Sequence, residues 1–132
     1  FTNGTDAFKL ALFTSSATLS KSTTAYTAPA DGTASPTNTH EVSSTSTGYT
    51  TGGNALTSTT PVLSGDTACC KFADTSFTSA SFTARGCLIY NSTNANKAVC
   101  SINFGADKTV TSGTFTIQFP AQTAGNAIIQ IA

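Results

Sequence analysis

The spacing of the apolar residues is the feature that most constrains how this sequence folds. They occur in short bursts rich in β-branched and aromatic residues, and Gly, Asn, Ser and Asp separate the bursts. At residues 114–119 (TFTIQF), Phe115, Ile117 and Phe119 alternate with Thr and Gln, which is the pattern of a half-buried antiparallel strand. Pro120 has no amide hydrogen, so it ends this strand or places it at a sheet edge.

These short apolar segments predict strands along the whole chain and no convincing helix. The candidate strands are residues 8–13, 61–63, 67–73, 81–84, 87–90, 97–104, 114–119 and 127–131. We therefore expect an all-β fold, a single antiparallel β-sandwich domain of the jelly-roll or Ig-like type over residues 1–132. Residues 20–60 are rich in Ser, Thr and Gly and predict long loops, with short strands near residues 41–42 and 55–56.

The composition argues against nucleic acid and membranes as partners. Six basic and six acidic residues balance, so no positive field is available to bind phosphates. No apolar run approaches the ~20 residues that span a bilayer. Charged residues make up 9% of the chain, against ~25% in an ordinary domain, and Ser and Thr supply roughly a third. A hydroxyl-rich surface with few charges is typical of a protein that packs against neighbours.

The four cysteines are disulfide candidates. If residues 91–96 form a hairpin loop, Cys87 lies directly opposite Cys100 across the two strands, where a bond is within reach. Cys69 and Cys70 are adjacent, so their side chains point to opposite faces of a strand. The alternatives are bonds that join Cys69 and Cys70 to the other two, bonds to another chain, or four buried thiols. The spacing does not fit the paired cysteines of a zinc site, and we expect no metal.

The sequence offers no catalytic constellation, and we expect neither an enzyme nor a cofactor. His40 is the only histidine and lies in a segment rich in Pro and Thr, where a solvated side chain is the usual outcome. The acidic residues are scattered singly, most of them beside Gly or Thr in turns.

Four further residues are candidates for interface or structural roles. Arg85 is the only arginine, and we expect it to bond loop carbonyls or a carboxylate such as Glu41 or Asp74, with a contact between subunits as the rival role. The other three are Tyr26, Tyr49 and Tyr90, whose flat rings are the only candidates for stacking on a glycan.

Five stretches cover most of the chain in order: DAFKLALFTSSATLSKSTTAYT (6–27), EVSSTSTGYTTGGNALT (41–57), FTARGCLIYNS (82–92), NKAVCSINFGADKTVTSGTFTIQFP (96–120) and AIIQIA (127–132). They resemble a family of small virion structural proteins of tailed bacteriophages, found among head or capsid accessory proteins. The stretch at residues 28–40 and the four cysteines depart from the family pattern. Family members begin with a segment before the first strand, so we expect a short N-terminal segment to be missing here.

The resemblance implies a non-enzymatic decoration or cement protein on the outer surface of the phage particle. Its partners would be the major capsid protein or other virion proteins and further copies of itself. Two alternatives stay open: a receptor- or glycan-binding module of a tail or fibre, and a surface β-domain that forms filaments.

Overall fold

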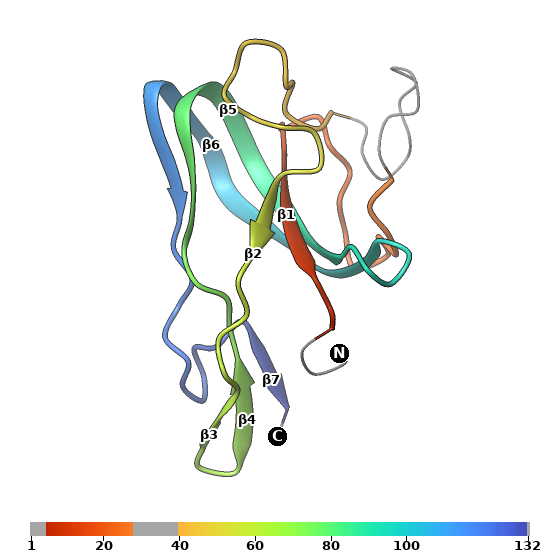
Figure 1. The fold of residues 1–132 in the computed structure, drawn as a ribbon, viewed down its shortest axis with the longest axis vertical. Helices are drawn as coiled ribbons and strands as arrows, with labels where there is room; N and C mark the ends of the chain where they lie inside the picture. The colour runs from red at the N-terminus through yellow and green to blue at the C-terminus, as the bar shows by residue number, and fades with distance from the viewer. Residues whose placement is uncertain (1–4, 28–39, 132) are drawn as a thin grey trace.

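A computed structural model describes residues 5–27 and 40–131. The helices and strands assigned in these ranges are all β-strands, with no helix among them. The strands are β1 (Phe8–Phe13), β2 (Asn54–Leu56), β3 (Val62–Ser64), β4 (Thr67–Cys70), β5 (Thr75–Asn91), β6 (Lys97–Ile117) and β7 (Ile129–Ile131). They form two antiparallel sheets, one with the order β2-β1-β5-β6 and one with the order β3-β4-β7 (Figure 1). The predicted all-β class is confirmed, and β1 has the predicted bounds.

The four-stranded sheet is buried on both faces at β1 and at the end of β5. Leu10, Ala11 and Leu12 are each 0% exposed, so successive residues of β1 lie in apolar surroundings on opposite sides of the sheet. Leu10 and Leu12 belong to the larger core cluster, whereas Ala11 and Phe13 pack with Tyr26 in a second cluster on the other face. A strand covered on both sides needs a continuous apolar run, and FKLALF supplies one.

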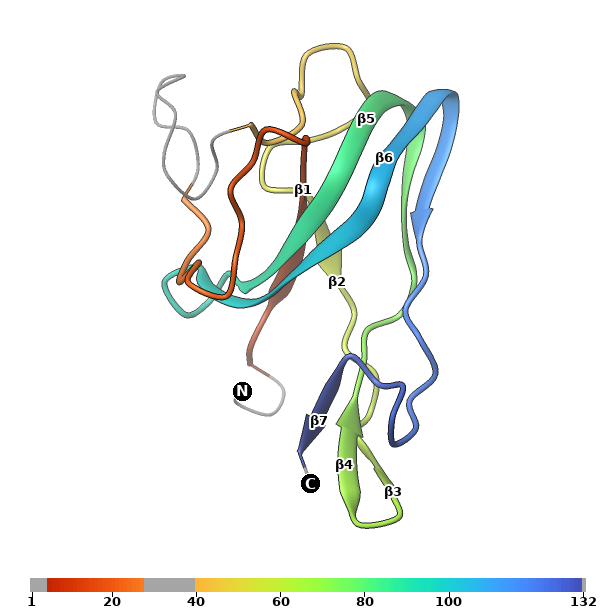
Figure 2. The ribbon, with the colours of Figure 1, turned by 180° about the vertical axis from the view of Figure 1, so that it is seen from behind.

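β5 and β6 form one long hairpin that bends back over the core (Figure 2). The sequence predicted two separate strands in each of them, at residues 81–84 and 87–90 and at residues 97–104 and 114–119. The register of the hairpin shifts at several points, and Ser79, Gly105 and Ser112 have positive φ angles. Bulges of this kind let a strand continue across polar and glycine positions, which the pattern of apolar residues does not reveal.

The register of the hairpin differs from the predicted one near the cysteines. Val99 is an extra residue in β6, so Cys100 lies opposite Ile89 and Cys87 lies opposite Ile102. The predicted direct pairing of Cys87 with Cys100 is therefore wrong. Both side chains pack against the larger core cluster as diagonal neighbours, which lie farther apart than directly opposed residues. All four cysteines are free thiols, and none forms the expected disulfide.

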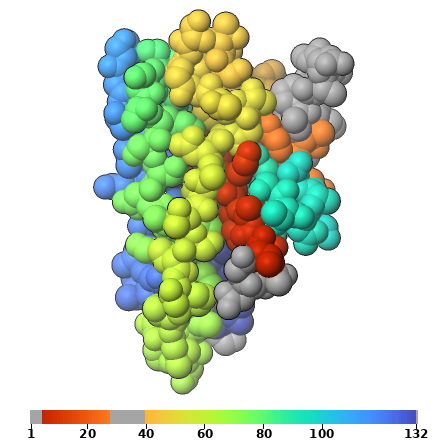
Figure 3. All heavy atoms as spheres, viewed as in Figure 1, coloured from red at the N-terminus to blue at the C-terminus, as the bar shows by residue number. Residues whose placement is uncertain are grey.

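The three short strands of the second sheet form the narrow end of the molecule (Figures 1 and 3). β4 and β7 are shorter than the predicted strands at residues 67–73 and 127–131, and β3 has the length of the predicted strand at residues 61–63 but begins one residue later. Of the two short strands expected in the Ser/Thr-rich stretch, β2 is present. The other is reduced to an isolated bridge between Phe13 and Glu41.

Candidate functional site

One face of the small sheet carries apolar side chains that the described chain leaves exposed or only partly covers. Leu63 pairs with Ala68, which pairs in turn with Ile131, so the three side chains lie on the same face. Leu63 is 75% exposed and Ile131 is 69% exposed. Cys70 pairs with Ile129 two residues further along β4, so the side chains of both lie on this face as well. We call these five residues the apolar face.

The opposite face of the small sheet is covered at Cys69, whereas Val62 on the same face is 41% exposed. Cys69 is 0% exposed there, although its neighbours in β4 are not buried. The side-chain amide of Gln122 donates to the backbone oxygens of Thr60 and Cys69 at 2.8 and 2.9 Å. The segment after β6 is thereby tied to the small sheet, and the apolar face is left as its outward side.

A second region of incompletely covered apolar side chains is a cleft of about 660 Å³ between the two halves of β6. Ile102 and Phe104 come from the first half of the strand, and Phe115 and Ile117 come from its end. All four are only partly buried against the core. The residues that line the cleft are Ile102, Phe104, Lys108, Phe115, Thr116, Ile117, Gln118, Phe119, Pro120 and Ile128. We call this region the open cleft.

The three tyrosines come together around the carboxylate of Glu41. The hydroxyls of Tyr26 and Tyr49 donate to its two oxygens at 3.0 and 2.6 Å, and the Gly52 amide donates at 2.7 Å. Tyr90 donates to the Gly52 carbonyl at 2.8 Å, and its ring stacks on that of Tyr26 with 4.4 Å between the centroids. We call these five residues the Glu41 network.

The burial of the network gives the tyrosines structural roles. Tyr26, Tyr49 and Tyr90 are 5%, 3% and 2% exposed, so none presents a ring face on which a glycan could stack. Burial, reinforced by the charge of Glu41, raises the pKa of all three phenols, that of Tyr90 to about 12. They remain protonated at neutral pH and act as hydrogen-bond donors.

Arg85 pairs with Asp107 rather than with the predicted Glu41 or Asp74. Its Nε donates to Oδ1 of Asp107 at 2.8 Å, and both side chains are partly exposed. A bulge in β6 opposite Arg85 makes this pair possible, because it inserts residues between the partners of Ala84 and Gly86.

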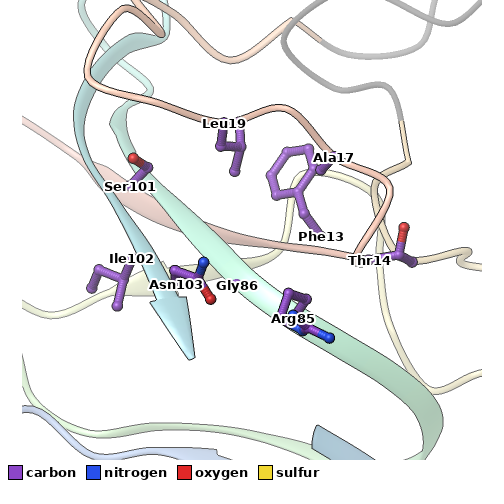
Figure 4. Close-up of a pocket in the computed structure, with 9 residues that line it drawn as sticks. All are labelled: Phe13, Thr14, Ala17, Leu19, Arg85, Gly86, Ser101, Ile102 and Asn103. Carbon is purple, nitrogen blue, oxygen red and sulfur yellow. The ribbon is translucent and has the colours of Figure 1, made fainter. Parts of the chain in front are cut away.

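Arg85 also lines a small pocket beside the sheet (Figure 4). Phe13, Ala17 and Leu19 form one side of this pocket, and strands β5 and β6 form the other. Its volume is about 130 Å³. Pockets that bind small molecules usually exceed ~300 Å³, so this one is too small for a substrate.

Cys87 and Cys100 are not poised as nucleophiles. Burial, with a smaller contribution from Cys100, raises the pKa of the Cys87 thiol to about 12. Burial also raises the pKa of Cys100. A reactive cysteine needs a lowered pKa, so these two act as small apolar residues of the core.

His40 contributes to the fold through its backbone. Its carbonyl accepts hydrogen bonds from the amide and the hydroxyl of Thr14, and its side chain is exposed. Asp74 accepts a hydrogen bond from the Phe119 amide. In residues 5–27 and 40–131, no three or more His, Cys, Asp and Glu side chains are grouped to hold a metal ion. No helix in these ranges is long and apolar enough to cross a membrane.

Sequence reasoning missed the apolar face and the open cleft. It predicted strands at residues 61–63 and 127–131 but not which side of them would be uncovered. Consecutive apolar residues such as Ile128 and Ile129 could have indicated an uncovered apolar side chain. A strand of three residues at a sheet edge rarely has both sides buried, so one of two neighbouring apolar side chains is left exposed.

Comparison with known proteins gives no relative. No family model, no curated protein and no solved structure matches the chain.

Proposed function

We propose that this chain is a non-enzymatic structural subunit of a bacteriophage virion, a decoration or cement protein on the outer surface of the head. The observation that carries the proposal is the apolar face, where Leu63 and Ile131 are 75% and 69% exposed on a surface poor in charge. Large apolar side chains clustered on an otherwise polar surface mark contacts with other proteins. The sequence resemblance to virion proteins supports a phage particle as the setting.

The proposed role is mechanical. The chain would pack against the major capsid protein and against copies of itself, and each contact would be repeated by the symmetry of the shell. A contact of ~800 Å² per partner is of ordinary size, and its effect on a lattice grows with the number of copies. Because the surface carries few charges, neighbouring copies repel one another little. We also propose that the sheets pack as a β-sandwich, of the jelly-roll or Ig-like type expected from the sequence.

Shells with and without the chain test the proposal. Both are heated, or transferred to low salt, and the fraction that releases DNA is measured. A cement protein raises the rupture temperature of the shells that carry it, and a Leu63→Ser/Ile131→Ser double variant restores the lower value. Equal rupture of shells with and without the chain would contradict the proposal.

A second candidate function, a surface β-domain that forms filaments, is favoured by the open edge of β6. Unpaired strand edges recruit further strands, and a contact that does not close on itself produces a fibre. Concentration-dependent growth of filaments by the purified chain would favour this candidate over the first. The third alternative, a glycan-binding module, gains no support from the buried tyrosines.

A further inference from the structure

The apolar face has a relief of large and small side chains. Leu63 in β3 and Ile131 in β7 lie on either side of Ala68 in the central strand, and all three are exposed. Neighbouring strands lie ~4.8 Å apart, so a large side chain stands one strand spacing away on each side of the small one. We call the strip over Ala68, between Leu63 and Ile131, the groove of the apolar face.

The groove is complementary to the edge of the face that contains it. When two sheets pack face to face, the side chains of the facing layers interdigitate, with large residues opposite small ones. A twofold axis that runs along the strands, midway between β3 and β4, places Leu63 of each copy over Ala68 of the other. Each Leu63 then also lies beside Ile131 of the opposite copy. Reciprocal contacts of this kind are the rule for a closed dimer.

The lack of charge on the small sheet favours a second copy over an unlike protein. Its strands, with the sequences VLS, TACC and IQI, contain no charged residue. Contacts between identical subunits are more apolar than contacts between unlike proteins, whose specificity depends largely on complementary charges. The six basic and six acidic residues of the whole chain also balance, so two copies approach without net repulsion.

The small size of the apolar face sets the strength of the contact. It has five side chains, whereas a standard interface has ~20–30 residues on each side. We therefore expect free chains to dimerise weakly, with a dissociation constant on the order of 0.1–1 mM. Copies held next to each other on a shell would associate more completely, because their effective concentration is higher.

We infer that the apolar face binds the same face of a second copy of this chain, across a twofold axis that seats Leu63 of each copy over Ala68 of the other. The inference rests on the contact role proposed above for the apolar face, and it adds the identity of the partner and the geometry of the contact.

The first test measures dimerisation of the purified full chain by sedimentation equilibrium under reducing conditions, at concentrations up to about 1 mM. Ala68→Leu is the decisive variant, because it makes the face more apolar but fills the groove. We expect its dissociation constant to rise at least about ten-fold, the effect of an overpacked contact. Unspecific association of apolar surfaces would instead become stronger. Val62→Leu, a matched enlargement on the opposite face of the same sheet, should leave the dissociation constant unchanged.

Disulfide trapping locates the contact. Leu63→Cys and Ala68→Cys are made separately in a Cys70→Ser background, which removes the native thiol of the same face. Mixed and mildly oxidised with diamide, the two variants should form a disulfide-linked dimer faster than either variant does alone. A mixture of Val62→Cys with Ala68→Cys should form it no faster than Ala68→Cys alone.

Three results would overturn the inference. They are a chain that stays monomeric up to about 1 mM, a dimer that Ala68→Leu strengthens or leaves unchanged, and equal trapping through Val62→Cys. Dimers whose backbone amides are protected from hydrogen exchange in β6 and not in the small sheet would also overturn it, because the copies would then meet at the strand edge. Shell rupture is measured separately, so a monomeric chain that still strengthens shells through Leu63 and Ile131 would leave the proposed function standing.

Discussion

The large sheet and the small sheet differ in how their apolar residues are covered. In the large sheet Leu10 and Leu12 are 0% exposed, and the tyrosines of the Glu41 network are buried beside them. In the small sheet Leu63 and Ile131 remain mostly exposed. Exposed apolar side chains add little to the stability of the isolated chain, and the function proposed above gives them a contact with a partner. The large sheet therefore holds the fold together, and the small sheet and open cleft are available to partners.

A pair of glycine substitutions gives the largest expected contrast between the two regions. Gly53 has φ +73°, and a Cβ there would lie 1.7 Å from the Leu10 carbonyl oxygen. Gly53→Ala must displace the backbone of β1, and we expect a loss of about 3 kcal/mol or more in the free energy of unfolding. Gly65, in the β3–β4 turn, has φ +62° and no atom within 4 Å of such a Cβ. Gly65→Ala should cost only about 1 kcal/mol, from the backbone angle alone.

Urea denaturation of the two variants measures this contrast. Equal losses would show that the two regions support the fold equally, contrary to the comparison above.

Removal of the carboxylate from the Glu41 network is expected to have the next largest effect. Glu41→Ala leaves two phenol hydroxyls and the Gly52 amide without their acceptor. Buried donors without partners cost about 1–3 kcal/mol each when nothing replaces the bond, so we expect a total loss near 3 kcal/mol. Asp66→Ala in the exposed β3–β4 turn is the matched control and should change stability by less than about 0.5 kcal/mol. Similar urea midpoints for the two variants would refute a structural role for the network.

Alkaline pH should weaken the same region. The folded-state pKa of Tyr90 is about 12, against an ordinary value of 10.0, so its stabilising contribution is complete below pH 10 and is lost as the pH rises toward 12. We expect the free energy of unfolding to fall over this range. Tyr90→Phe should make the profile shallower without flattening it, because the raised pKa values of Tyr26 and Tyr49 act over the same range, whereas Leu63→Ser should leave the profile unchanged. A profile that Tyr90→Phe leaves unchanged would count against the shifted pKa.

The smallest effect on stability is expected at the apolar face. Leu63→Ser and Ile131→Ser remove side chains that are mostly in solvent, so each should change the free energy of unfolding by less than about 0.5 kcal/mol. Leu12→Ala, the matched change in the large sheet, should cost about 2–5 kcal/mol. A large loss in the free energy of unfolding of the serine variants would show that the small sheet is part of the folding core.

The sequence predicted those parts of the fold that depend on local pattern. FKLALF predicted β1 to the residue, and the alternation of Phe115 and Ile117 with Thr predicted their shared face. The register of the long hairpin could not be predicted, because one extra residue at Val99 and the positive φ of Gly105 arise from tertiary packing.

The candidate site was predicted less well than the fold. Tyr26, Tyr49 and Tyr90 were named as interface or structural candidates, but their common partner Glu41, which lies 15 residues from Tyr26 and 8 from Tyr49, was not. The apolar face depends on which side of β4 the segment after β6 covers, and this is decided by Gln122. Neither contact leaves a periodic signal in the chain.

Hydrogen exchange of the chain, free in solution and bound in the phage particle proposed for it, tests the central claim most directly. We expect protection on assembly to be concentrated in β3, β4 and β7 and along β6 beside the open cleft. Exchange in β1 and around the Glu41 network should be slow in both states. Protection confined to the opposite end of the molecule, with the small sheet unchanged, would contradict the assignment of the apolar face as the contact surface.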